Sequence, residues 1–301
     1  MENEKKRRPG RPSKKPPIPP LELKGIVNSP MYPEDMLEFV YGDPTVFKSL
    51  FTYFKNVKTR EIHLRCNPQG LTFFARDHSK TSRIVAHVAG EHVNWHYCEG
   101  EIWLGINRDN VEKMFSTIDK SFFKITILYR KKELNENDLI FIFKDPSLEK
   151  ECEYRIQTST YTRDDDLYDA EKALDPASIN TTFPVEFTLS AKQFKKSIGD
   201  ASHYSDTITI EKIKQHILFT YEKPNMKYIE TYRVAEKIKL RSSIPESVMF
   251  GVRIKILNVK SLANSMVTDD IRILCRGDED ILFRSALDEK ALVVSTLTKI
   301  S

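Results

Sequence analysis

The sequence predicts an α+β fold made of two copies of one domain, and three observations lead to this prediction. Alternating apolar and polar residues, typical of half-buried strands, recur along most of the chain, as in Ile62-His63-Leu64-Arg65. Apolar residues at helical spacing occur convincingly in only four segments, two in each half. A set of apolar residues from the first half is repeated in the second half at nearly constant spacing.

The repeat is clearest where residues 62–73 align without a gap with residues 208–219, at a spacing of 146 positions. Upstream, Phe47 matches Phe194, and downstream the run 138–143 resembles the run 280–285. Three matches in the same order indicate a duplicated domain. The apolar pairs of the first match are Ile62 with Ile208, Leu71 with Ile217, and Phe73 with Phe219.

Each copy is expected to contain two amphipathic helices. Asn107 is a candidate N-cap, and Ser190 with Gln193 three residues later fits a capping box. Surface helices commonly carry lysine, so one basic stripe alone is weak evidence. Because all four helices keep such a stripe, the pattern favours phosphate contacts that read no base. The predicted helices span residues 45–57, 107–118, a segment from Ser190, and about 253–266.

Composition limits the class of protein. The 301 residues, of which 40% are hydrophobic, are enough for two domains with a core each. No apolar run is long enough to span a bilayer, and residues 1–20 carry charge and proline where a signal peptide is apolar, so an intracellular protein is expected. The four cysteines lie far apart and fit a reducing compartment rather than a disulfide framework or a cysteine zinc site.

Charge and composition also suggest the domain boundaries. The formal net charge is +4, but residues 1–20 alone hold seven basic residues against two acidic ones, so the rest of the chain is close to neutral. Asp164-Asp165-Asp166 begins an acidic stretch typical of a solvated connector. We therefore predict a disordered basic arm at 1–33, one domain at 34–156, an interdomain connector at 157–183 and a second domain at 184–301.

The arm has a signal of its own. Arg8-Pro9-Gly10-Arg11-Pro12 resembles an AT-hook, whose arginines lie in the narrow minor groove of A/T-rich DNA. Its order departs from the usual Arg-Gly-Arg-Pro core, so a generic basic tether or a nuclear-import signal is the alternative. The arm residues expected to contact DNA are Arg7, Arg8, Arg11, Lys14 and Lys15.

A metal-dependent enzyme is the rival prediction from another class. His78, His87, His92 and His96 lie within a short stretch together with Asp77 and Cys98. The surrounding residues alternate as strands do, which separates histidines that a helix would bring together, so solvated or capping histidines are favoured over a metal site. The chain contains no phosphate-binding loop and no assignable catalytic triad. No catalytic residue, no cofactor and no metal are expected.

Three segments resemble the proliferating cell nuclear antigen (PCNA) family of DNA sliding clamps, including the clamp-like proteins of African swine fever virus and related large DNA viruses. They are 36–51 (MLEFVYGDPTVFKSLF), 70–85 (GLTFFARDHSKTSRIV) and 194–203 (FKKSIGDASH). The resemblance extends over about residues 34–301 and contains no catalytic signature, so its specificity comes from order and spacing.

The resemblance implies a PCNA-like clamp fold, with outer antiparallel sheets, inner helices and two similar domains per chain. It implies a homotrimeric ring that encircles double-stranded DNA and acts as a processivity factor in DNA replication and repair. The departures from the family are Gly199, where a basic residue is common, and the polar Arg76, Lys80 and Asp280. DNA-binding residues from the helices, matched to the family or lying on a stripe, are Lys48, Lys55, Lys113, Lys192, Lys195, Lys196, Arg253 and Lys260.

The same resemblance implies two protein-binding surfaces. DNA polymerase and other replication or repair proteins are expected to insert a short peptide, and subunits to pair edge strands. The partner-peptide residues are Arg76, Lys80, Thr81, Leu167, Tyr168, Asp280, Leu297 and Ile300. The subunit-interface residues are Cys152, Tyr154 and Ile156 of one chain with Tyr228 and Tyr232 of the next.

The expected partners are therefore DNA, replication proteins and further copies of this chain, with no membrane. The expected location is the host cytoplasm, the nucleus or both. A monomeric or dimeric clamp-fold protein, or a checkpoint-type ring of different chains, is the alternative assembly.

Overall fold

A computed structural model describes most of the chain after the basic arm. The described residues are 22, 24–56, 59–77, 82–119, 121–130, 137–145, 149–161, 183–234, 238–246, 250–265, 269–276, 280–286 and 291–298.

Two domains with the same order of elements follow one another. The first contains β1 (Asp35–Tyr41), α1 (Pro44–Asn56), β2 (Glu61–Asn67), β3 (Gly70–Arg76), β4 (Ser82–Ala89), β5 (Trp95–Cys98), β6 (Ile102–Asn107), α2 (Arg108–Ser116), β7 (Lys124–Arg130), β8 (Asp138–Asp145) and β9 (Lys150–Thr160), with a short 3₁₀ turn at Gly90–His92. The second contains β10 (Val185–Ser190), α5 (Ala191–Ala201), β11 (Thr207–Ile213), β12 (His216–Lys223), β13 (Met226–Arg233), β14 (Lys239–Ser242), β15 (Phe250–Lys255), α6 (Ile256–Ser265), β16 (Asp270–Arg276), β17 (Asp280–Ala286) and β18 (Ala291–Thr298).

The duplication predicted from the apolar pairs is present in the fold. Ile62 and Ile208 are buried at matching positions of β2 and β11, and Phe73 and Phe219 are buried in β3 and β12. By the shared order of elements, β4 corresponds to β13 and β9 corresponds to β18. This correspondence matters for assembly, because β4 and β18 are the strands that join the two domains.

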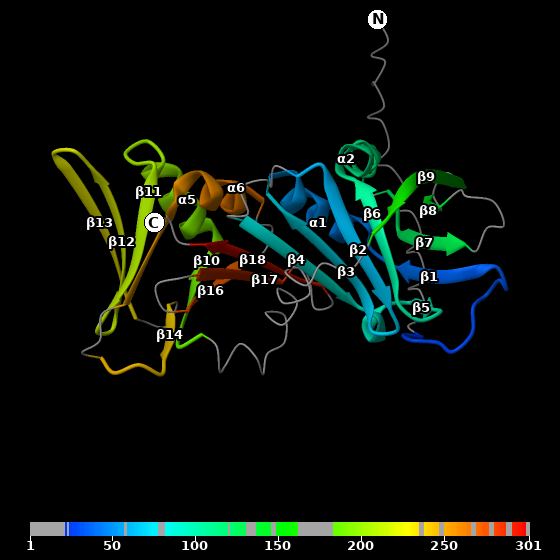
Figure 1. Ribbon diagram of the computed structural model, residues 1–301, viewed down its shortest axis with the longest axis horizontal. Helices are drawn as coiled ribbons and strands as arrows, with labels where there is room; N and C mark the ends of the chain where they lie inside the picture. Colours follow the sequence, from blue (N-terminus) through cyan, green and yellow to red (C-terminus); the bar gives the residue numbers. More distant parts are fainter. Residues whose placement is uncertain are drawn as a thin grey trace, which may run out of the picture.

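Each domain contributes two runs of antiparallel strands. In the first domain these are β4-β3-β2-β6 and β9-β8-β7-β1-β5, and in the second they are β13-β12-β11-β15 and β18-β17-β16-β10-β14. β18 pairs with β4 over seven registered residue pairs, from Ala291 opposite Val88 to Leu297 opposite Ser82. One continuous sheet therefore crosses the domain boundary, as Figure 1 shows.

The helices lie together on one side of the sheets. In Figure 1 they form a row in the order α2, α1, α6, α5, and contacts join α2 to α1, α1 to α6, and α6 to α5. Across the domain boundary, the hydroxyls of Tyr53 and Ser285 are 3.2 Å apart and buried. The row of helices is thus continuous across both domains.

Helix boundaries agree with the capping signals in the first domain and differ in the second. The side chain of Asn107 accepts a hydrogen bond from the backbone N–H of Asn110, as an N-cap does. Ser190 precedes α5 as predicted but makes no side-chain capping bond. The fourth helix begins at Ile256, not at 253, because Val252 and Ile254 alternate with exposed residues in β15.

Residues just before β1 belong to the folded domain, so the arm ends earlier than the predicted boundary at residue 33. The backbone of Gly25 and Val27 exchanges hydrogen bonds of 2.9 Å with that of His96 in β5. The buried Glu38 carboxylate accepts bonds from the backbone N–H of Met31 (2.7 Å) and from the indole N–H of Trp95 (2.7 Å). We call residues 24–27 the strap, because their backbone lies along the edge of β5. β9 continues to Thr160, past residue 157, where the connector is predicted to begin.

Candidate nucleic-acid interface

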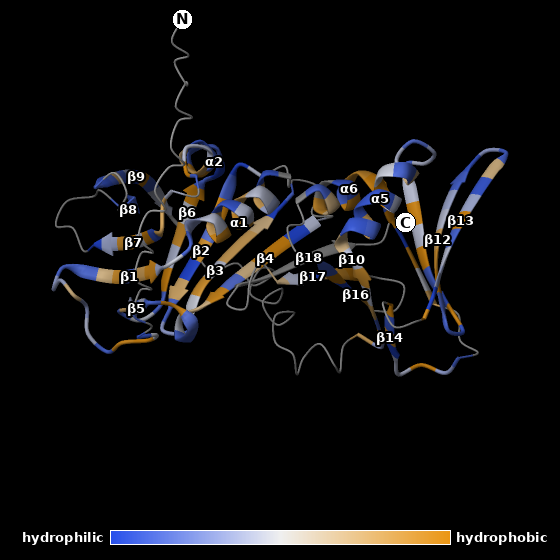
Figure 2. Cartoon of the chain, turned by 180° about the vertical axis from the view of Figure 1, so that it is seen from behind, coloured by the Kyte–Doolittle hydropathy of each residue, from blue (hydrophilic) through white to orange (hydrophobic). Residues whose placement is uncertain are grey.

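The polar side of the helix row is the candidate surface for nucleic acid. Each helix packs apolar residues against the sheets, for example Phe47 and Phe54 of α1, Phe194 of α5 and Val259 of α6, all fully buried. In Figure 2 hydrophilic colours follow the outward side of α5, while the strands beneath the helices alternate between hydrophobic and hydrophilic colours. Helix amphipathicity therefore turns the basic stripes away from the core.

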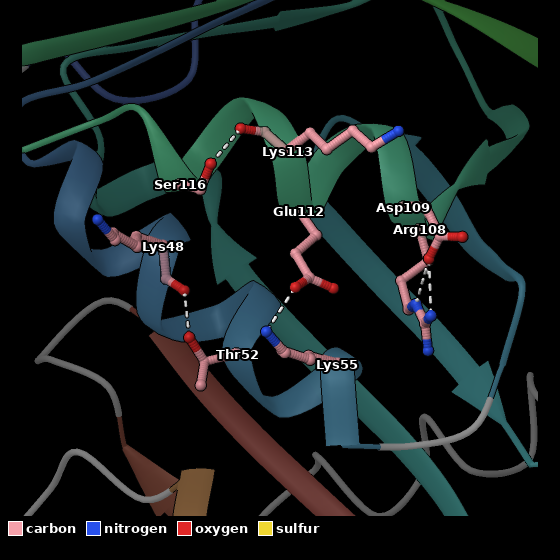
Figure 3. Close-up of polar contacts among 8 residues, drawn as sticks. All are labelled: Lys48, Thr52, Lys55, Arg108, Asp109, Glu112, Lys113 and Ser116. Carbon is pink, nitrogen blue, oxygen red and sulfur yellow. Dashed lines mark hydrogen bonds and ion pairs between the residues drawn. The ribbon is translucent and has the colours of Figure 1, made fainter.

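In the first domain, two of the predicted DNA-binding lysines make bonds within the protein. Lys48 Nζ donates a 2.6 Å hydrogen bond to the backbone carbonyl of Ile118. Lys55 Nζ lies 2.5 Å from a carboxylate oxygen of Glu112 on α2 (Figure 3). The Lys113 side chain is exposed, and its amine has no hydrogen-bond or ion-pair partner within the described part of the chain. Of these three amines, that of Lys113 is thus free of a competing protein contact.

Acidic residues on α2 reduce the positive charge of this half further. Arg108 pairs with Asp109 at 2.6 Å, and the resulting hydrogen bond and charge lower the pKa of the Asp109 carboxyl (Figure 3). α2 carries Arg108 and Lys113 against Asp109 and Glu112, so its formal charge is zero. With Lys48 and Lys55 of α1, the helix pair carries a formal charge of +2, but both of these amines are already bonded within the protein.

In the second domain, the lysines of α5 are fully available. Lys192, Lys195 and Lys196 are exposed, and none of their amines has a hydrogen-bond or ion-pair partner among the residues that the structure describes. Lys260 of α6 is half-buried and donates a 2.9 Å bond to the hydroxyl of Ser202. A Cβ added at Gly199, where the family resemblance leads one to expect a basic residue, would meet no atom within 4 Å.

Arg253 is predicted to lie on a helical stripe, and the structure corrects this. It lies on β15 and its guanidinium donates to the Thr207 hydroxyl at 3.2 Å. The buried residues Val252 and Ile254 have a period of two, which is the period of a strand and not of a helix. Arg253 is exposed on β15 and belongs to neither α5 nor α6.

Both ends of the fold present a strand edge that the described residues leave uncovered. β13 pairs with β12 alone. Lys150–Gln157 of β9 pair only with β8, and Thr158–Thr160 pair with β6. Met226, Tyr228 and Ile229 on β13 are each more than 40% exposed. Large apolar side chains at an open edge are typical of strands that pair with another chain.

Of the predicted interface residues, not all are accessible. Tyr228 is exposed and Cys152 and Tyr154 are half-buried, so their side chains can meet a partner. Ile156 is buried, and Tyr232 is buried with its hydroxyl 2.5 Å from that of Ser197. Ile156 and Tyr232 can therefore contribute only backbone to a strand pair.

The predicted partner-peptide residues converge where they are described. β3 ends at Arg76, β17 begins at Asp280, and Leu297 near the end of β18 is opposite Ser82 at the start of β4. Because β3, β4, β18 and β17 are adjacent, these positions lie at one end of four neighbouring strands. Lys80, Thr81, Leu167, Tyr168 and Ile300 lie outside the described residues, as do the arm residues Arg7, Arg8, Arg11, Lys14 and Lys15.

Comparisons with known proteins identify the family. The model of the N-terminal domain of proliferating cell nuclear antigen matches residues 36–166. The chain is 43% identical over 303 residues to an uncharacterized protein of African swine fever virus, covering 99% of this chain and 98% of that protein. It is 21% identical to proliferating cell nuclear antigen of Saccharomyces cerevisiae, over 83% of this chain and 92% of the relative.

The chain belongs to the PCNA family. Its fold agrees with this assignment. The crystal structure of the PCNA from Entamoeba histolytica superposes with a TM-score of 0.70 at 14% identity, covering 89% of this chain and all of the other. The chain is thus a DNA clamp by homology, and a scaffold without catalytic chemistry is the type of protein this family contains.

The histidines considered for a metal site are spread over separate elements. His87 Nδ1 lies 3.0 Å from the Thr72 hydroxyl, and His96 Nε2 lies 2.7 Å from the backbone carbonyl of Asn67. His92 sits at the surface beside Glu91. Within the described ranges, no three histidine, cysteine or acidic side chains come together as a metal site would require. His78 lies outside those ranges.

Sequence reasoning missed the interactions that distinguish the lysines of this PCNA-family chain. Glu112 and the Ile118 carbonyl come from segments distant from α1 in sequence, so the periodicity of α1 gives no indication of them.

In the part of the chain that the structure describes, every helix is too short or too polar to cross a membrane.

Proposed function

We propose that this chain forms a homotrimeric ring that encircles duplex DNA and holds polymerase and other replication or repair proteins on it. The observation that carries the proposal is a match between two pairs of strands. Within the chain, β18 pairs with β4 and joins the domains. Their counterparts in the repeat, β9 and β13, each present an edge that the described residues leave open, one at each end of the fold.

Pairing β9 of one chain with β13 of the next would repeat the internal junction between chains. The contact is heterologous, because each chain offers a different edge to its two neighbours, and heterologous contacts close into rings when the rotation permits. Every junction, internal or between chains, would then have the same geometry and keep the helices on one side. Two domains per chain and six domains per ring give three chains, as the family resemblance implies.

In such a ring the helix row lines the central hole. The amines of Lys113, Lys192, Lys195 and Lys196 would make weak, exchangeable contacts with phosphates, each displacing condensed counterions and reading no base. Retention would come from enclosure rather than affinity, which suits a protein that must slide. The basic arm would add contacts from outside the hole, including the minor groove if it acts as an AT-hook.

Partner proteins would bind at the strand ends near Arg76, Asp280 and Leu297, together with the connector. Arg76 and Asp280 are polar, so we expect a partner peptide that differs from the usual apolar plug of the family. Replication of DNA would place the ring in the nucleus or at a cytoplasmic replication site of a host cell.

The mass of the particle tests the assembly. Light scattering should give three times the chain mass of 35.0 kDa, and disruption of the edge pairing by Ile229→Pro in β13 should reduce it to that of one chain. The matched control is Ile26→Pro in the strap, outside both open edges, which should leave the trimer intact. A monomer or dimer for the unmodified chain, with or without DNA, would rule out the closed homotrimer.

A further inference from the structure

The face of the second domain turned away from the helices carries a group of basic residues. Along β10, β16 and β17, the buried residues Phe187, Ile273 and Phe283 belong to the core beneath α5 and α6. Alternation along each strand places Glu186, Arg272 and Arg284 on the opposite face. This group is therefore separate from the candidate nucleic-acid interface.

Strand register brings these residues into one row. Thr188 is opposite Lys239 on one side and opposite Arg272 on the other, and Arg272 is opposite Arg284. Neighbouring strands lie ~4.8 Å apart, so the row from β14 to β17 is about 14 Å long. Arg241, opposite Glu186, lies two residues along β14 from Lys239. We call Lys239, Arg241, Arg272 and Arg284 the outer arginine cluster.

Within the described residues, the carboxylate of Glu186 forms ion pairs with two members of this cluster. Glu186 pairs with Arg241 at 2.7 Å and with Arg272 at 3.7 Å. Arg284 has no hydrogen-bond or ion-pair partner in the described ranges, and its half-buried position, followed by the charge of Arg272, lowers its pKa. Like charges directly opposite one another destabilise a sheet. The fold thus holds excess positive charge here at a cost to its own stability, which a bound anion would offset.

We propose that the outer arginine cluster binds an acidic segment of a partner protein. The planar guanidinium groups of Arg272 and Arg284 present paired N–H donors that match carboxylate oxygens, and their adjacent strands suit acidic residues close together in a peptide. Glu186 holds Arg241 and Arg272 in place, while Arg284 offers its donors directly to the ligand.

The short extent of the cluster favours a short peptide over nucleic acid as the ligand. Beyond β18, the same face of the sheet continues with Val85 and Phe74, which are buried apolar residues packed near Trp103. A nucleic-acid backbone needs basic residues that continue along its path, whereas this row ends after four strands. In the proposed ring the enclosed DNA also lies on the other side of the sheets, so this face meets proteins. Peptide binding at this face does not itself require the ring.

The test measures binding of a short oligoglutamate peptide to the full chain by fluorescence anisotropy, with oligoglutamine of equal length as a blank. The double variant Arg272→Gln/Arg284→Gln should bind the peptide on the order of tenfold more weakly or worse, because each charge-assisted bond is large on the scale of such an interaction. The matched control Lys144→Gln/Lys214→Gln removes the same charge from exposed sites elsewhere and should bind as the unmodified chain does.

A second readout separates binding from folding. Removing the opposed arginines should leave the unfolding temperature unchanged or raise it, since like-charge repulsion is relieved. Equal peptide binding by both double variants, or no binding by the unmodified chain, would overturn the proposal. So would tighter cluster-dependent binding of single-stranded oligothymidylate than of oligoglutamate. Inorganic phosphate that competes no better than chloride would support a peptide ligand, and displacement by phosphate at equal ionic strength would count against it.

Discussion

The two helix pairs come from copies of one domain, yet their lysines stand in different surroundings. On α1, Lys48 is bonded to a backbone carbonyl and Lys55 to Glu112, whereas on α5 Lys192, Lys195 and Lys196 have no such partner among the described residues. Both helices carry a basic stripe in the sequence. We infer that a basic stripe becomes a phosphate-binding surface only where neighbouring elements leave its amines unpaired.

Removing the free amines of α5 should have the strongest effect on DNA binding. The result also distinguishes the contribution of α5 from that of α1. Replacing Lys192, Lys195 and Lys196 together by Ala should weaken binding to duplex DNA by about an order of magnitude or more, and should reduce the salt slope by about 0.9 for each phosphate that is no longer neutralised. Fluorescence anisotropy over a range of salt concentrations measures both quantities.

The matched control is Lys48→Ala/Lys55→Ala on α1, which should change the salt slope much less. Equal changes in both variants would show that the internal bonds of α1 yield to DNA. Unchanged binding in both would mean that DNA does not touch the helix row at all.

Acid should destabilise the first domain more than the second. Burial, followed by the charges of Arg65 and His96, lowers the pKa of His87 to about 4. Above the ordinary histidine pKa of about 6.5, His87 is neutral in both the folded and the unfolded state, so this histidine does not lower the free energy of unfolding there. As the pH falls from there toward 4, the unfolded state takes up the proton first, which costs on the order of 2–3 kcal/mol.

Denaturant unfolding at several pH values checks this. His87→Gln, which can keep a bond to Thr72, should flatten the pH dependence over that window. A variant that loses stability with acid as steeply as the unmodified chain would show that other groups cause the acid lability. His203 is exposed in the second domain, and His203→Gln serves as the control.

Disrupting the contact between α1 and β17 at the domain boundary should have a moderate effect on stability. Tyr53→Phe removes the hydroxyl that meets Ser285 across the domain boundary, and should cost about 1 kcal/mol of unfolding free energy. Calorimetry should show this decrease without a change in oligomer mass. No measurable decrease would mean that water replaces the hydroxyl, and that apolar packing holds α1 against β17.

The smallest expected effect comes from Glu112→Gln, and it tests directly why the lysines of α1 and α5 differ. Glu112→Gln breaks the ion pair with Lys55, which is exposed, so the stability should fall by only about 0.2–0.5 kcal/mol. The freed amine should make DNA binding slightly tighter and the salt slope slightly steeper. Weaker DNA binding by this variant would contradict the idea that Glu112 competes with phosphate.

The duplicated fold could be predicted from sequence because the apolar pattern is local and repeated. Ile62, Phe73 and their counterparts lie in hairpins whose register depends on neighbours in sequence. The N-cap at Asn107 could be predicted for the same reason. The start of α6 could not, because Val252 and Ile254 alternate as in a strand and are followed at once by helical spacing.

The site could be predicted only as a set of exposed basic residues. Whether Lys48 is bonded to Ile118 depends on tertiary packing, for which the sequence holds no local signal. The outer arginine cluster could not be predicted from the sequence either, because Arg241, Arg272 and Arg284 come together only through the order of β14, β10, β16 and β17. The pairing of residues 24–27 with β5 was not predicted, because the basic composition of the residues before them indicates a disordered arm.

Whether the helices face DNA enclosed by a ring can be decided by retention on linear duplexes with free or blocked ends. Protein threaded onto the duplex should survive a high-salt wash when streptavidin blocks both ends afterwards, and should dissociate when the ends stay free. Equal retention on both duplexes, or equal dissociation from both, would contradict topological enclosure.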